Sequence, residues 1–187
     1  SREKILDLAI KIEGHPDNVT SALLGGCQIV VHNESNHVAS EVPLPESLNV
    51  IIFIPDVVIQ TADTRKQLPA NVTRQDAIFN IGRVALLIKA LSTGDLTHLK
   101  IATEDRLHQP IRQKIFPPMK TIINAATRAG ALGAFLSGSG PSVIALANER
   151  EVSIGYEMSD AAAKSGVPGT LKITRPTTKG AHLIQQK

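Results

Sequence analysis

The apolar residues at the start of the chain repeat with the spacing of an amphipathic helix. Ile5, Leu8 and Ile12 recur three or four positions apart. Ser1 can cap such a helix and Gly14 can end it. The pattern therefore predicts a helix over residues 1–14.

A shorter apolar run follows. Asp17 and Asn18 can cap a second helix over VTSALL, which two glycines then end. The residues CQIVVHN at 27–33 predict a strand, whereas the polar stretch 33–47 contains two prolines and predicts a loop or a connection between domains.

The second part of the chain begins with a continuous apolar run, LNVIIFIP at 48–55, which predicts a buried strand. Further helices are expected near 77–94, 95–106, 118–129 and 149–165, and further strands near 133–137, 142–147, 170–175 and 181–185. The first of these helices should bury a stripe of Ala77, Ile78, Ile81, Val84, Ala85, Ile88 and Leu91. This order of elements predicts an α+β fold, with helices layered on a mostly antiparallel sheet.

The composition is that of an ordinary globular protein, with 187 residues of which 42% are hydrophobic and 20% charged. No apolar run approaches the roughly 18 residues of a membrane helix and no signal-peptide pattern is present, so we expect no membrane contact and a cytoplasmic location. The net charge of +3 is scattered, and one Tyr with no Trp offers few surfaces for stacking bases, which argues against a nucleic-acid partner. The single cysteine, Cys27, lies in an apolar run and is typical of a small core residue.

The segment EGHPDN at 13–18 crowds polar groups directly after the first predicted helix. Glu13 could bind Mg²⁺, and Asn18 could hydrogen-bond a substrate hydroxyl. The same residues could form a capped polar turn, which their spacing alone favours over a site.

Two arginines and two histidines lie close to prolines. Arg65 and Arg112 suit bidentate recognition of a carboxylate or phosphate, although each could also be an ordinary surface arginine. For His15 and His108 a structural, hydrogen-bonded role competes with a role in a site. The histidines show no metal-ligand spacing, and no nucleophile motif is present.

The loop SGSGP at 137–141 separates two predicted strands. Its glycines allow positive φ and close approach to a ligand, and its N–H groups could face an anion. A plain turn between strands explains the same residues. The loop matches neither a Walker motif nor a dinucleotide fingerprint.

Four segments in order, EGHPDNV with LLGG, TADTRKQLP, EDRLHQPIR and FLSGSGPSVIALA, resemble the homoserine kinases of the GHMP kinase superfamily, from residue 1 to at least 147. The resemblance implies a GHMP kinase fold, in which 1–45 complete an N-terminal α+β domain and 46–187 form a ferredoxin-like C-terminal domain with an antiparallel sheet. It also implies transfer of the γ-phosphoryl group of ATP, with Mg²⁺, to the side-chain hydroxyl of L-homoserine in threonine biosynthesis.

The resemblance also implies roles for individual residues. Glu13 would hold Mg²⁺ between the ATP phosphates, and Asn18 would be the catalytic and substrate-binding residue at the hydroxyl. Thr61, Arg65 and Arg112 would bind the substrate, with both arginines facing its carboxylate.

The glycine loop would support the substrate and phosphate region through Gly138, Ser139 and Gly140, with Gly138 also binding substrate. The matching segments contain three further residues to which no role is assigned: His15, Asp17 and His108.

One part of the family pattern has no counterpart in these 187 residues. The nucleotide loop of the superfamily, which in its members lies upstream of a helix like the one at Ser1, is absent. We therefore expect a C-terminal portion that is inactive alone, with the missing N-terminal segment as its partner and a homodimer as a further assembly. The alternatives are another GHMP small-molecule kinase and a non-catalytic binding module.

Overall fold

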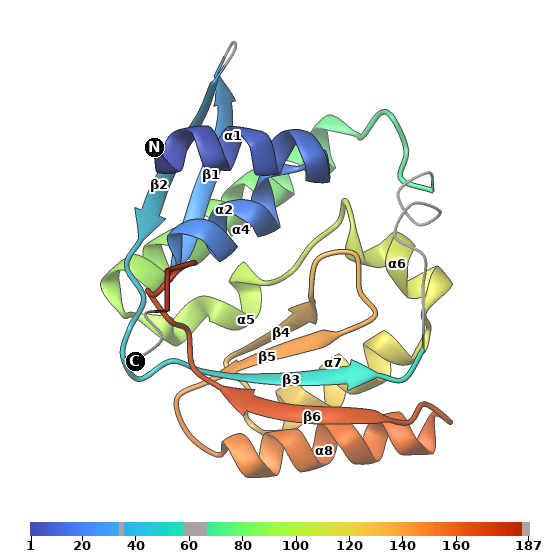
Figure 1. Ribbon diagram of the computed structural model, residues 1–187. Coiled ribbons are helices and arrows are strands. Elements are labelled where there is room, and N and C mark those ends of the chain that lie inside the picture. Colours follow the sequence, from blue (N-terminus) through green and yellow to red (C-terminus); the bar gives the residue numbers. More distant parts are fainter. Residues whose placement is uncertain (34–35, 58–66, 185–187) are drawn as a thin grey trace.

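Two helices and a hairpin form the N-terminal part of the protein (Figure 1). The computed structural model describes residues 1–33, 36–57 and 67–184. Helix α1 (Arg2–Glu13) is followed by α2 (Pro16–Leu24), and the strands β1 (Cys27–Asn33) and β2 (Asn36–Val42) pair antiparallel. The bounds of α1 and β1 agree with the sequence prediction.

Two expectations for this part are wrong. Helix α2 begins at Pro16, so Asp17 and Asn18 lie inside its first turn instead of capping it, because a proline with its fixed φ is suited to the first helical position. Residues 36–42 form β2 instead of a loop. Most of this strand is exposed, so its polar residues concealed the pairing with β1.

The second sheet has the ferredoxin-like arrangement. Its strands β3 (Asn49–Pro55), β4 (Gly133–Leu136), β5 (Val143–Ala147) and β6 (Gly169–Thr174) lie in the order β4-β5-β3-β6, with every neighbouring pair antiparallel. Helices connect β3 to β4, and α8 (Glu151–Lys164) connects β5 to β6. This βαββαβ order is that of a split βαβ fold and confirms the predicted α+β class.

Two hydrophobic clusters hold the sheet to its helices. Helix α7 (Pro118–Ala129) and α8 pack on one face, where Phe53, Ile122 and Met158 are buried (Figure 1). The other face meets α4 (Arg74–Thr93), the 3₁₀ turn η1 (Leu96–His98) and α5 (Leu99–Ala102) through a second cluster, against which Cys27 packs as expected for a core residue. No helix among the described residues is long and apolar enough to span a membrane.

The helices between β3 and β4 differ from the prediction in two respects. The helix expected over 95–106 ends at Ala102, and a further helix, α6 (Gln109–Ile115), follows it. Along α4, the predicted buried stripe is wrong for Ile78, Ile81, Val84 and Ala85, all of which are exposed. The buried residues of α4, Ala90 and Leu91, lie near its C-terminal end, in the cluster that they share with η1 and α5.

The chain does not end in the strand expected at 181–185, because the described residues 181–184 form none. Instead, the segment that follows β6 lies beside the C-terminal end of α2 (Figure 1). The N–H of Gly26 donates to the carbonyl of Thr177 at 2.8 Å, and the N–H of Ala181 donates to the carbonyl of Ala22 at 3.0 Å. These bonds fasten α2 to the end of β6 and so place the α1–α2 corner above the second sheet.

Candidate active site

The segment EGHPDN forms the corner between α1 and α2. Gly14 adopts the left-handed conformation with φ 81°, and its N–H donates to the carbonyl of Ile10 at 2.8 Å. His15 is then extended and α2 begins at the next residue. Because the chain reverses within two residues, the carboxylate of Glu13 and the first turn of α2 lie side by side.

A cavity of about 550 Å³ is lined by residues of this corner, of α6 and of the loop between β4 and β5. It brings together eight of the eleven residues predicted from the sequence: Glu13, His15, Asp17, Asn18, His108, Arg112, Gly138 and Ser139. Thr61 and Arg65 lie outside the described residues. A second cavity of about 540 Å³, between α5, α6 and α7, is lined by none of the eleven, so the chemistry selects the first.

Arg112 is the most deeply buried charged group of the cavity, with 2% of its surface exposed. Its Nε donates to Nε2 of His108 at 3.2 Å, one helical turn earlier. An Nε2 that accepts this bond leaves the imidazole proton on Nδ1, so His108 is neutral. Burial, followed by the charge of Arg112, lowers the pKa of His108, and the smaller effect of Asp105 opposes them.

Only some residues of the glycine loop line the cavity. Gly138 and Gly140 have φ of 54° and 80°, and the N–H of Gly140 donates to the carbonyl of Ser137 at 2.8 Å. That bond closes the turn and occupies the Gly140 donor, and Gly140 does not line the cavity. Gly138 and Ser139 are therefore the loop residues that can meet a ligand.

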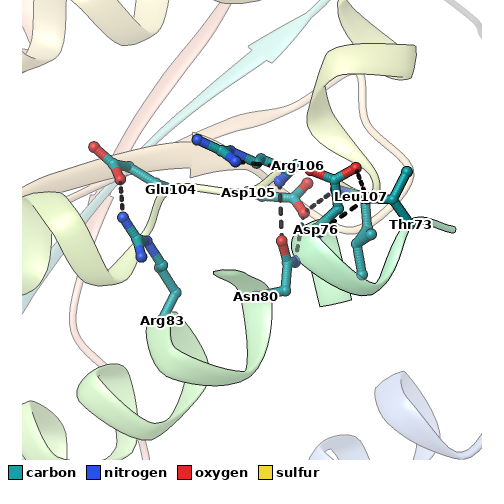
Figure 2. Close-up of polar contacts among 8 residues, drawn as sticks. All are labelled: Thr73, Asp76, Asn80, Arg83, Glu104, Asp105, Arg106 and Leu107. Carbon is teal, nitrogen blue, oxygen red and sulfur yellow. Dashed lines mark hydrogen bonds and ion pairs between the residues drawn. The ribbon is translucent and has the colours of Figure 1, made fainter. Parts of the chain in front are cut away.

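Sequence reasoning missed two further polar residues of the cavity wall, Asp105 and Gln109. Gln109 accepts a hydrogen bond from the N–H of Leu136 at 3.1 Å and donates to the carbonyl of Thr103 at 3.2 Å, so it joins α6 to β4. Asp105 accepts from Asn80 of α4 (Figure 2). Both lie in the quoted segment EDRLHQPIR, where an aspartate shortly before a proline is a helix-cap signal.

Comparison with known proteins identifies the fold. Residues 87–162 match the family model described as GHMP kinases C terminal. The crystal structure of homoserine kinase from Cytophaga hutchinsonii superposes with a TM-score of 0.90 at 28% identity, covering 96% of this chain and 59% of that one. The protein thus has the GHMP kinase fold, and its matched region is a GHMP kinase C-terminal domain.

The relatives within this class are homoserine kinases. That of Moorella thermoacetica is 41% identical over 181 residues, which cover 97% of this chain and 61% of the relative. That of Caldicellulosiruptor bescii is 45% identical over 149 residues, which cover 80% of this chain and 48% of the relative. The chain is therefore similar to homoserine kinases over most of its length and spans less than two thirds of theirs.

The neutral state of His108 predicts a loss of stability in mild acid. Because its pKa is lowered in the folded protein, the unfolded chain takes up this proton first as the pH falls through about 6.5. The free energy of unfolding should therefore fall between pH 7.5 and 5.5, and less steeply in His108→Asn, which keeps an acceptor for Arg112. Urea denaturation at both pH values measures this, and parallel losses in the two proteins would contradict it.

Proposed function

We propose that the protein containing this chain phosphorylates the side-chain hydroxyl of L-homoserine with ATP, in the cytoplasm and as a step toward threonine. The supporting observation is the single cavity that joins the carboxylate of Glu13, the amide of Asn18, the buried Arg112 and the loop residues Gly138 and Ser139. The names of the relatives point to the same reaction. Because the chain spans 61% of the first relative, the proposal concerns the parent protein and not the isolated chain, which we expect to be inactive.

Arg112 would bind the substrate carboxylate. Its Nε donates to His108, and the planar guanidinium has the geometry that suits a carboxylate. Arg65 and Thr61 would complete this recognition from the segment outside the described residues. Hydrogen bonds to charged groups contribute about 1.5 to 3 kcal/mol each, enough to distinguish an amino acid from a simple alcohol.

Asn18 would position the reacting hydroxyl. It lies in the first turn of α2, where it lines the cavity with an exposed side chain. An amide is not a base at neutral pH, so Asn18 can orient the hydroxyl through a hydrogen bond without accepting its proton. The proton would leave to the phosphoryl group itself, in keeping with a transfer that depends on positioning and charge neutralisation.

Glu13 would be the protein ligand of Mg²⁺. The described residues contain no group of three His, Cys, Asp or Glu side chains able to hold a metal ion. A single carboxylate fits Mg²⁺, which commonly takes one or two carboxylates together with phosphate oxygens and water. The bound ion would neutralise charge on the phosphates, while the N–H groups of Gly138 and Ser139 support the same region.

The apolar faces left open by the fold suit the remaining part of the parent protein. Ile12 of α1 is 88% exposed and Ile81 of α4 is 68% exposed, and Leu8 and Ile78 accompany them. Residues this apolar are seldom left in water on a monomer surface. We place the missing N-terminal segment over these faces, with residues 1–45 completing its domain and 46–187 forming the C-terminal domain. A second copy of the protein is the competing occupant.

Replacing Arg112 tests the assignment of the carboxylate. Arg112→Lys keeps a charge but loses the planar pair of donors, so the KM for homoserine should rise about 10- to 100-fold in the parent enzyme while the KM for ATP stays within twofold. Arg65→Ala should act in the same direction. Steady-state kinetics with each substrate varied measure this split, and an equal loss toward both substrates refutes the assignment.

Replacing Glu13 tests the metal site. Glu13→Gln keeps the shape of the side chain and removes the charge, so kcat should fall by about 100-fold or more, and excess Mg²⁺ should restore it only in part. A magnesium titration of kcat measures the effect. Wild-type turnover in Glu13→Gln would remove Glu13 from the metal site.

A further inference from the structure

The carboxylate of Asp105 organises the first turn of α6. Its Oδ1 accepts from the N–H of Leu107 at 2.8 Å, and its Oδ2 accepts from the N–H groups of His108, at 2.9 Å, and Gln109. Burial alone would raise the pKa of Asp105, but these bonds and one from Asn80 together hold it below its ordinary value. His108, the N-cap residue of α6, makes no side-chain capping bond, and the charged, half-buried carboxylate of Asp105 caps the N–H groups that lead into the helix in its place.

Asn80 uses both ends of its side-chain amide to hold this cap. Its Nδ2 donates to Oδ1 of Asp105 at 2.7 Å, and its Oδ1 accepts from the N–H of Arg106 at 3.0 Å (Figure 2). Asn80 lies on α4, 25 residues before Asp105, and is only half-buried. No other side chain of this size offers both a donor and an acceptor in the same plane.

A continuous series of hydrogen bonds joins Asn80 to the candidate active site. Asn80 fixes Asp105, Asp105 fixes the N–H groups of His108 and Gln109, and His108 accepts from Nε of Arg112 at 3.2 Å. Asn80 does not line the cavity. A guanidinium binds a carboxylate well only when it is held within about 0.5 Å of the required position. A rotation of α6 would therefore move the guanidinium of Arg112 out of that position.

We propose that Asn80 is a positioning residue of the active site, which acts through Asp105 to orient α6 and so to place Arg112 for the substrate carboxylate. This rests on the proposed phosphorylation of homoserine. Asn80 does not line the cavity and bonds to one of its lining residues, Asp105, so its role is positioning and not catalytic.

Two ion pairs between the same elements provide a matched control. Arg83 of α4 pairs with Glu104 at 3.0 Å, and Arg106 pairs with Asp76 of α4 at 3.8 Å (Figure 2). Both arginines also lie over the ring of Phe79, at 3.4 and 3.9 Å from its centroid. These contacts hold the segment before α6 onto α4 at a partly exposed surface, but they do not include the α6 cap.

The experiment compares Asn80→Ala, Asn80→Asp and Glu104→Gln in the full-length parent enzyme. Asn80→Ala should raise the KM for homoserine at least tenfold, with the KM for ATP within twofold, and should speed amide hydrogen exchange at Leu107, His108 and Gln109 at least tenfold. Glu104→Gln, which removes the charge of the ion pair with Arg83 between the same elements, should leave all of these within twofold.

Asn80→Asp separates the two bonds of the amide. Aspartate still accepts from the N–H of Arg106 but faces Asp105 with a second carboxylate, so the proposal requires a loss at least as large as in Asn80→Ala. Wild-type behaviour of Asn80→Asp would assign the effect to Arg106 and overturn the proposal. Equal effects of Asn80→Ala and Glu104→Gln would also overturn it, because any contact between α4 and the segment before α6 would then have the same effect on the site.

Failure of the proposed function is distinguishable from failure of this inference. A wild-type parent that does not phosphorylate homoserine refutes the function, while hydrogen exchange in α6 still decides whether Asn80 orders that helix. A wild-type parent that is active, with unchanged homoserine KM in Asn80→Ala, refutes the inference alone. Thermal unfolding of each variant identifies a protein that does not fold, and Asn80→Ser then replaces Asn80→Ala.

Discussion

The carboxylate of Asp105 accepts hydrogen bonds from Asn80 of α4 and from three successive backbone N–H groups at the start of α6. A half-buried carboxylate is costly unless it is bonded in this way, so the position of the first turn of α6 is tightly constrained. Through that turn, the hydrogen bonds to Asp105 also constrain the positions of His108 and Arg112, which line the cavity. Gln109 extends the same constraint to β4 through the N–H of Leu136.

The other walls of the cavity depend on separate constraints. The left-handed Gly14 brings Glu13 beside α2, and the bonds from Gly26 to Thr177 and from Ala181 to Ala22 hold these helices against the end of β6. The glycine loop projects from the edge of the second sheet, where β4 pairs with β5. Three segments that are distant in sequence therefore meet because each is fixed by its own local hydrogen bonds, and the result is a polar cavity with one deeply buried guanidinium.

The sequence pattern predicted correctly those elements whose apolar residues are buried by contacts within the described part of the chain. Ser1 and Gly14 delimit α1, and the apolar run at 49–55 forms β3, because their patterns report contacts made within the described fold. Pattern reading failed for β2, whose residues are largely exposed, and for Ile78, Ile81 and Val84, whose apolar spacing is not matched by burial in the described part of the chain. An apolar stripe on a helix predicts that its residues are buried, but it does not identify the segment that buries them.

The residues of the candidate site also divide into those that the sequence predicted and those that it did not. Eight of its residues could be named from family motifs, and the structure brings those eight to one cavity. Asp105, Gln109 and Asn80 escaped notice because they bond mainly to backbone groups and to each other, and no residue pattern reveals such partners before the fold is known.

Substrate turnover by the full-length parent protein tests the central claim most directly. With ATP and Mg²⁺ present, kcat/KM is measured for L-homoserine, mevalonate and shikimate under the same conditions. Mevalonate and shikimate also carry a carboxylate, so this comparison tests the whole proposed function and not the Arg112 contact alone, and the proposed function predicts a preference for homoserine of at least about 100-fold. Equal or faster phosphorylation of mevalonate or shikimate would contradict the account.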